Sequence, residues 1–230
     1  MKSKEKNIVI TSAARTAIGT FKGSLKAVRG HELGAIVIKE IMRKSNLKPN
    51  DVDELIMGQV LTGGTGQNPA RQAAMQAGLP IDKTAYVINQ VCGSGLRSVA
   101  AGYQAIISGD SNVIIAGGQE SMSNAPHAIN FRNGNELDEK NLVDTMIKDG
   151  LWDAFYGYHM GVTAENVAAK WKITRKEQDE FALLSQHKAE KAQKEGKFKN
   201  EIIPVVLKKK NDNNKFEIDE HPRVGMTLDR

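Results

Sequence analysis

The sequence predicts an α/β fold whose first half is a mainly parallel, layered mixed sheet with helices, followed by an inserted α+β loop subdomain. Short β-rich runs alternate with helical patterns up to about residue 120, which implies right-handed crossovers between parallel strands. Beyond that point residues 121–150 are polar and rich in Asn, Asp and Gly. We therefore expect one domain over residues 1–120 and a smaller subdomain over residues 121–230.

The first elements are predicted from apolar spacing. The run Ile8-Val9-Ile10 predicts a strand. Residues 31–42 predict a helix, because apolar residues recur every four positions from Leu33 to Ile41. Residues 55–57 predict the next strand.

A second helix has signals at both of its ends. Asn68 is a favourable N-cap, and Pro69 is favoured at the first helical position. Gly78 stands where such a helix would end.

A strand at residues 85–89 runs into Cys92 and then into a longer helix that stops at Gly109. Apolar residues trace one face of that helix, namely Leu96, Val99, Ala100, Tyr103, Ile106 and Ile107. The run at residues 113–116 is uniformly apolar and predicts a strand buried on both faces.

The second half predicts two more helices and a strand-rich end. Residues 163–171 and 174–192 are helical in pattern, and Thr174 and Glu177 have capping-box spacing at the start of the second. Residues 201–218 are strand-like around a charged turn.

The composition restricts the class of function. Lys and Arg exceed Asp and Glu by five, which suits an anionic small ligand as well as an ordinary solvated surface. Few aromatic residues are present and none interleave with basic ones, so we expect no nucleic-acid partner. One cysteine allows neither an internal disulfide nor a zinc cluster, so we expect no metal and a reducing compartment. The short apolar run near the start is no signal peptide, and no stretch is long enough to span a membrane, so we expect a soluble, cytoplasmic protein.

Cys92 is the candidate catalytic residue. A cysteine between a strand and a helix lies beside backbone N–H groups and the positive end of a helix dipole, which favour a thiolate and could stabilise an oxyanion. Gly93 and Gly95 would leave room for a substrate. The alternative is that Cys92 is a small buried apolar residue at a tight turn.

Two glycine-rich segments could instead suggest nucleotide binding. The segment from Gly93 to Ser98 nearly matches the dinucleotide motif G-x-G-x-x-G/A, but Ser98 occupies its last position and no acidic residue follows a strand at the required distance. Residues 63–66 lack the Lys-Ser/Thr of a phosphate loop and predict a turn into the second helix.

The segment Asn-Gln-Val-Cys-Gly-Ser-Gly-Leu-Arg-Ser at residues 89–98 resembles the acyl-enzyme signature of the thiolase family, and Ala-Gly-Gly-Gln-Glu-Ser-Met-Ser at 116–123 resembles the segment that follows it. The resemblance runs through nearly the whole chain and includes Arg15-Thr16 after two alanines, Gly66 to Gln72, Asp149 to Leu151 and His159 to Gly161. Within the family, the biosynthetic acetyl-CoA acetyltransferases are the most similar members.

The resemblance implies a thiolase-like layered fold and an acyl-transfer reaction. Such enzymes join two acetyl-CoA molecules into acetoacetyl-CoA, or run the reverse cleavage, through an acyl-cysteine. By position Cys92 would be the nucleophile, and its own backbone N–H would help to hold the oxyanion. No permanent cofactor is implied, because the CoA thioester is the substrate.

The resemblance also implies that the inserted subdomain binds CoA through Leu151, His159, Met160 and Arg223. Each has a simpler interpretation. Leu151 and Met160 could be core residues, His159 a structural or exposed histidine, and Arg223 a solvated charge near a turn.

Family members are commonly tetramers built from dimers, and residues 123–150 match the region used for that assembly, so a homo-oligomer is expected. Ala17 stands where many members have proline. The family pattern continues beyond Arg230 into a second half that supplies an activating histidine, a second cysteine as base and an asparagine. We therefore expect these 230 residues alone to lack turnover and to expose an apolar surface. Two alternatives remain, another condensing enzyme of the same wider fold and a non-catalytic acyl-CoA-binding protein.

Overall fold

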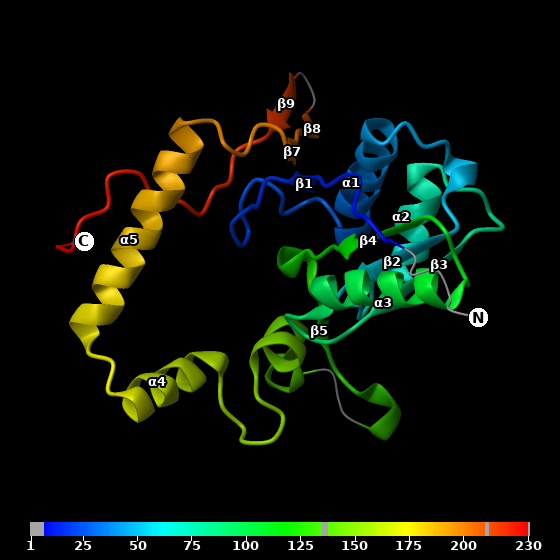
Figure 1. Cartoon of the computed structure of the whole chain (residues 1–230). Helices are drawn as coiled ribbons and strands as arrows, with labels where there is room; N and C mark the ends of the chain where they lie inside the picture. The colour runs from blue at the N-terminus through cyan, green and yellow to red at the C-terminus, as the bar shows by residue number, and fades with distance from the viewer. Residues whose placement is uncertain (1–6, 135–137, 210–211, 230) are drawn as a thin grey trace, which may run out of the picture.

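The computed structural model describes residues 7–134, 138–209 and 212–229. In its first part, helices cover both faces of a parallel sheet (Figure 1). The elements of this part are β1 (Arg15–Thr16), α1 (Gly30–Lys44), β2 (Glu54–Gly58), α2 (Pro69–Ala77), β3 (Thr84–Ile88), α3 (Ser94–Ser108) and β4 (Ile114–Gly118). The α/β class predicted from the sequence is confirmed.

The second part has two longer helices and several short strand pairs. Its elements are β5 (His127–Ala128), β6 (Val143–Asp144), a π-helical turn (Met146–Leu151), α4 (Met160–Trp171), α5 (Arg175–Lys194), β7 (Ile202–Ile203), β8 (Val205–Lys209) and β9 (Asp212–Phe216). Strands β5 and β6 pair antiparallel, as do β8 and β9, whereas β7 pairs parallel to β1. The chain therefore returns to the first part after α5.

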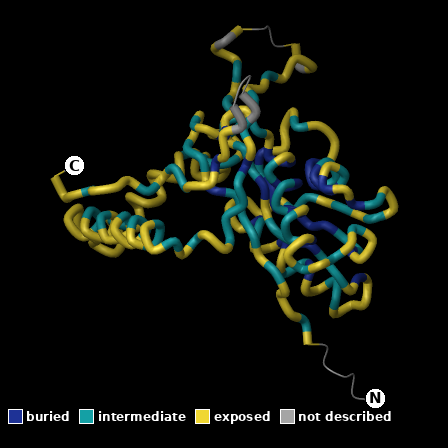
Figure 2. Tube along the Cα trace, turned by 90° about the horizontal axis from the view of Figure 1, so that it is seen from above, coloured by how far each residue is buried: buried dark blue, intermediate teal, exposed yellow. Residues whose placement is uncertain are grey.

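The two parts differ in burial. In Figure 2 the buried segments gather in the first part, whereas the helix beside the C-terminus shows only exposed and intermediate residues. No buried residue is found among the described residues of α4 or α5. The capping box of Thr174 and Glu177 opens α5 as predicted.

The central sheet fixes one edge at which three strands end. Its order is β3-β2-β4, and both pairings are parallel. Gly58 at the end of β2 pairs with Ile88 of β3 and with Gly118 of β4. Because the carboxyl ends of parallel strands lie on the same side, the segments that follow them meet at this edge, where α/β proteins commonly bind ligands.

Side chains alternate between the two faces of β2. Leu55 and Met57 pack with α1 and α2 in the larger core cluster, and Ile56 lies on the opposite face. On α1 the fully buried apolar residues are Ala35, Ile38 and Met42. The predicted stripe from Leu33 to Ile41 is only half-buried. The face of α1 that packs against the alanines of α2 is the neighbouring one, with Ala35, Ile38 and Met42.

Helix α3 packs against the sheet through small residues. Its buried positions are Ser94, Ser98 and Gly102, and a Cβ at Gly102 would lie 3.2 Å from the Ile114 side chain. The apolar face found in the sequence points outward instead, with Leu96 79% and Tyr103 54% exposed. The expected exposed apolar surface is therefore confirmed, and it lies on α3.

Two strand predictions need correction. No strand forms at residues 8–10, where Val9 and Ile10 are 71% and 80% exposed, because no described segment hydrogen-bonds to them. Strand β4 is confirmed, but Ile115 is its only fully buried residue among those described.

The end of β2 lies in direct contact with the first turn of α3. A Cβ at Gly58 would fall 2.4 Å from the carbonyl carbon of Ser94 and 2.5 Å from the backbone nitrogen of Gly95. Backbone atoms cannot swing aside as a side chain can, so only glycine fits here.

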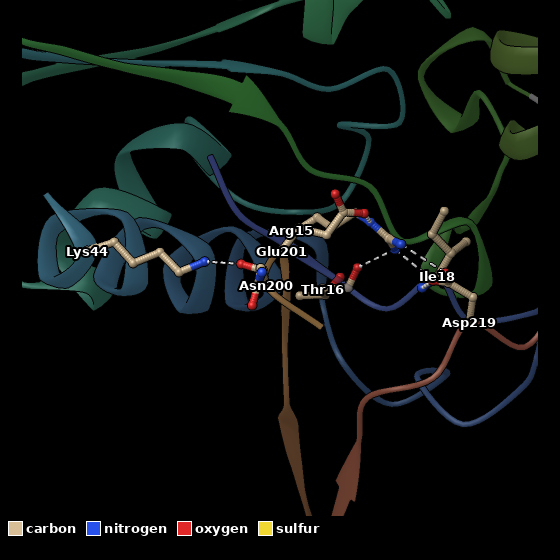
Figure 3. Close-up of polar contacts among 7 residues, drawn as sticks. All are labelled: Arg15, Thr16, Ile18, Lys44, Asn200, Glu201 and Asp219. Atoms are coloured by element: carbon tan, nitrogen blue, oxygen red, sulfur yellow. Dashed lines mark hydrogen bonds and ion pairs between the residues drawn. The ribbon is translucent and has the colours of Figure 1, made fainter. Parts of the chain in front are cut away.

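A polar cluster fastens the returning chain to β1 (Figure 3). The terminal nitrogens Nη1 and Nη2 of Arg15 donate to the two carboxylate oxygens of Asp219 at 2.7 and 2.9 Å, and its Nε donates to Glu201 at 2.7 Å. The Lys44 ammonium donates to the carbonyl oxygen of Asn200 at 2.6 Å. The hydrogen bonds that Arg15 donates to Asp219 lower the pKa of that carboxyl group and raise the pKa of the Arg15 guanidinium.

We predict that Gly58→Ala lowers the free energy of unfolding by about 1–3 kcal/mol, because the added methyl group forces α3 away from the sheet. The matched control is Gly63→Ala, since a Cβ at Gly63 meets nothing within 4 Å. Urea unfolding of both variants checks the prediction, and equal losses would contradict it.

We also predict that Asp219→Asn lowers stability in a pH-dependent way. The folded-state pKa of Asp219 is lowered, so its contribution is complete above the unfolded-state pKa and is lost as the pH falls through the folded value. The variant should be less stable than the wild type by about 2 kcal/mol near neutral pH. The difference should disappear well below about pH 4. Chemical unfolding across this range measures it, and a difference independent of pH would refute the assignment.

Candidate functional site

A cavity of about 450 Å³ lies at the edge where the three central strands end. Residues that follow β2, β3 and β4 line it, together with Leu151 from the second part. Cys92 is one of these lining residues and is exposed. This exposure excludes the alternative in which Cys92 is a buried core residue.

The turn that carries Cys92 is tight and strained. Val91 has a φ of 48°, in the left-handed region that β-branched residues rarely adopt. Backbone hydrogen bonds close the turn from Gly93 to the Gln90 oxygen at 3.0 Å and from Ser94 to the Val91 oxygen at 3.1 Å. Strain of this kind persists only where surrounding contacts enforce it, and it is frequent at functional sites.

Ser94 supplies those contacts. Its buried hydroxyl accepts a hydrogen bond from the Gln90 backbone nitrogen at 2.8 Å and donates one to the Val91 oxygen at 2.6 Å. This role of Ser94 was not predicted from the sequence. The sequence feature that points to Ser94 is its spacing of four residues from Ser98 and of eight from Gly102. Small residues at this spacing mark the face of α3 that packs against the sheet.

The position of Cys92 suits a nucleophile that attacks a thioester. It lies two residues before the start of α3, at the positive end of the helix dipole, which favours negative charge. No hydrogen bond of the Cys92 backbone N–H is found within the described part of the chain. That N–H could therefore donate to an oxyanion formed on an attacked carbonyl group.

Gly95 lines the cavity beside Cys92, so its expected role in leaving room for a substrate stays a prediction. It also faces Gly118, where a Cβ would lie 3.4 Å from the Gly95 Cα.

Glu120 fixes the wall of the cavity and was also missed. One of its carboxylate oxygens accepts hydrogen bonds from the backbone nitrogens of Val60 at 2.8 Å and Leu61 at 3.3 Å. These bonds tie the segment after β4 to the segment after β2. The signals in the sequence were an acidic residue four positions after the predicted strand at residues 113–116 and its place in the family-like segment at residues 116–123.

The structure separates the other predicted site residues. Leu151 shares the cavity with Cys92, whereas His159 and Met160 lie at the start of α4. The Nδ1 atom of His159 accepts from the Gly161 backbone nitrogen at 3.0 Å. Arg223 lines a second cavity of about 380 Å³ against α5.

Two further properties concern the described residues only. They contain no cluster of three or more His, Cys, Asp or Glu side chains suited to a metal ion. None of their helices combines the length and the apolar character needed to cross a bilayer.

Comparisons with known proteins agree with one another. A family model described as "Thiolase, N-terminal domain" matches residues 8–230. An acetyl-CoA acetyltransferase of Rhizobium meliloti is 58% identical over 223 residues, which cover 97% of this chain and 57% of that protein. The cytosolic acetyl-CoA acetyltransferase of Mus musculus is 49% identical over 222 residues, which cover 96% of this chain and 56% of the relative.

A solved structure is also similar. The crystal structure of the Bacillus anthracis acetyl-CoA acetyltransferase has a TM-score of 0.91 at 39% identity, with 96% of this chain and 56% of that chain covered. The chain thus spans a little over half the length of the relatives it matches.

We predict that Ser94→Ala lowers stability by about 1–3 kcal/mol, because it removes both hydrogen bonds that the buried Ser94 hydroxyl makes, with the Gln90 nitrogen and with the Val91 oxygen. It should also slow modification of Cys92 by a thioester, since the turn loses its brace. The control is Ser108→Ala at the exposed end of the same helix, which should change neither property. Urea unfolding and timed intact-mass measurements test both effects, and equal behaviour of the two variants would contradict the role of Ser94.

Proposed function

The chain belongs to the thiolase family, and we propose that its Cys92 accepts the acetyl group in an acetyl-CoA acetyltransferase. The observation that carries the proposal is an exposed thiol at a strained strand–helix turn, inside a cavity at the carboxyl edge of a parallel sheet. Relatives named for this activity, 58% and 49% identical over nearly the whole chain, support it.

In the first step the Cys92 thiolate attacks the carbonyl carbon of acetyl-CoA. The electron pair moves onto the carbonyl oxygen, where the Cys92 backbone N–H stabilises it. The intermediate then collapses, the bond from carbon to the CoA sulfur breaks, and the CoA thiolate takes up a proton. The product is an acetyl thioester on Cys92.

In the second step the acetyl group is passed to a second acetyl-CoA. A base removes a proton from the methyl group of that molecule, and the resulting carbanion attacks the acetyl-cysteine carbonyl. Acetoacetyl-CoA leaves, and the Cys92 thiolate is restored. The family resemblance assigns the base to a second cysteine, and Cys92 is the single cysteine of these 230 residues. We propose that the base, the activating histidine and the asparagine come from outside them.

For CoA we propose a path from the Cys92 cavity along the second part. Leu151 would contact the acyl end, since it lines that cavity. The Nδ1 atom of His159 is engaged by Gly161, so its Nε2–H is the donor left for a ligand. Met160 is 37% exposed beside it. The Arg223 guanidinium would bind an anionic group of CoA.

The remaining proposals concern organisation and location. We propose that residues 1–120 carry the nucleophile and residues 121–230 bind CoA, which acts as substrate with no permanent cofactor. We propose a homo-oligomer, a dimer or tetramer, without nucleic-acid or membrane partners. We also propose a cytoplasmic location, which fits a protein with one cysteine and a cytosolic relative.

We predict that incubation with acetyl-CoA adds one acetyl group to this chain, at Cys92. Intact-mass analysis with peptide mapping measures it, and Cys92→Ser under identical conditions is the control. The oxygen nucleophile lacks the ready ionisation of a thiol and should remain unmodified. Binding of acetyl-CoA without a mass shift would instead support a non-catalytic acyl-CoA-binding protein.

The chain alone should form no acetoacetyl-CoA, because no second cysteine is present to act as base. Cleavage of acetoacetyl-CoA by the purified 230 residues, at a rate close to that of a full-length relative, would refute this division of roles.

A further inference from the structure

The return segment, residues 217–228, runs from β9 back along α5 without forming a helix or strand (Figure 1). It carries Arg223, for which a CoA contact is proposed above. No strand ladder holds this segment, so single hydrogen bonds determine where it lies. One is a backbone bond, from the Glu220 nitrogen to the Ile18 oxygen at 3.0 Å, and the others involve side chains that gather mainly at two places.

The first contact joins Asp219 to the start of the chain. Its carboxylate accepts two hydrogen bonds from Arg15 and one from the Ile18 backbone nitrogen at 2.8 Å (Figure 3). The Asp219 side chain is only 10% exposed. Paired and largely buried, this carboxylate has little freedom to move.

The side chain of the next residue, Glu220, packs into the loop of residues 20–24. Its carboxylate accepts from the Thr20 backbone nitrogen at 2.7 Å, from the Thr20 hydroxyl at 3.0 Å, and from the Ser24 hydroxyl. A Cβ at Gly23 would lie 2.4 Å from a Glu220 carboxylate oxygen, so a side chain there would displace it. The hydrogen bonds from Ser24 and Thr20 lower the pKa of Glu220, because they stabilise its ionised form.

The second contact lies a few residues further along, on α5. The Arg223 backbone nitrogen donates to the Gln186 side chain at 2.8 Å, and that of Gly225 donates to Glu190 at 3.3 Å. Between the two contacts Pro222 fixes one backbone angle of the link. The return segment is therefore tied to the first part at residues 219–220 and to α5 at residues 223–226. Helix α5 also reaches residue 219, since the Gln193 side chain donates to the Asp219 backbone oxygen at 3.2 Å.

We propose that Asp219 and Glu220 are positioning residues that set where Arg223 lies and thereby determine the affinity for the nucleotide end of CoA. The two carboxylates and the loop of residues 15–24 form a carboxylate clamp. The inference deepens the proposed function and rests on it. The clamp does not touch the reacting atoms, so it acts on binding and not on the chemistry at Cys92.

The test uses the double variant Asp219→Asn/Glu220→Gln and two acetyl donors. Acetyl-CoA carries the nucleotide, whereas S-acetyl-N-acetylcysteamine has the same reactive thioester without it. The acetyl-CoA concentration that gives half the maximal rate of Cys92 acetylation should rise at least about tenfold. The rate with the small thioester should change less than about twofold. Glu40→Gln, which removes a carboxylate paired with Arg43 on α1, is the matched control and should match the wild type.

A double-mutant cycle shows whether the clamp acts through Arg223. In an Arg223→Ala background the clamp variant should raise the half-maximal acetyl-CoA concentration by less than about twofold. The reason is that the guanidinium that the clamp positions is already absent. Additive effects would overturn the proposal. An equal loss with both thioesters would also overturn it, since that outcome indicates general damage to the fold.

Hydrogen exchange tests the positioning without CoA. In the clamp variant the amides of Arg223 and Gly225 should exchange at least about tenfold faster. The amide of Val113, which is held by Asp53 at 3.0 Å, should not change. Unchanged exchange at Arg223 and Gly225 would overturn the proposal. If neither thioester acetylates the wild type, the proposed function and the claim about CoA affinity both fail. Hydrogen exchange would still show whether the clamp positions the return segment.

Discussion

The contact between the first turn of α3 and the ends of β2 and β4 determines the geometry of the site. Gly58, Gly95 and Gly118 meet there with no side chains between their backbones. This close approach places the amino end of α3 at the sheet edge where β3 ends and the turn with Cys92 follows. The position of the thiol therefore depends on the absence of a side chain at Gly58, where a Cβ would fall 2.4 Å from the Ser94 carbonyl carbon, as well as on the cysteine itself.

Hydrogen bonds made by two polar side chains also hold the backbone around the cavity in place. Ser94 holds the strained turn before α3, and Glu120 holds the cavity wall after β2. Both side chains act on backbone groups that would otherwise lack partners near the cavity. Helix α3 in turn presents a small-residue face to the sheet and an apolar face to solvent, with Leu96 the most exposed of its larger apolar residues.

The second part is attached to the first by few contacts. A small apolar cluster joins Ala17 and Leu25 to Val205 and Phe216, and the carboxylates near Arg15 lie beside it. Helices α4 and α5 contribute no buried residue within the described chain. The placement of Arg223 relative to Cys92 thus depends on a limited set of side chains, among them the Arg15–Asp219 pair and Glu220.

The sequence alone determined what local chemistry controls: the helix that begins at Pro69, the capping box of α5, the strand that runs into Cys92, and the family. Only the tertiary structure decided which faces of α1 and α3 are buried and that residues 8–10 form no strand. It also brought together Glu120 with Val60, and Asp219 with Arg15, across 60 and 204 positions. Caps and turns are encoded by neighbours in sequence, whereas burial and long-range pairing depend on which element comes to lie alongside, which no local pattern specifies.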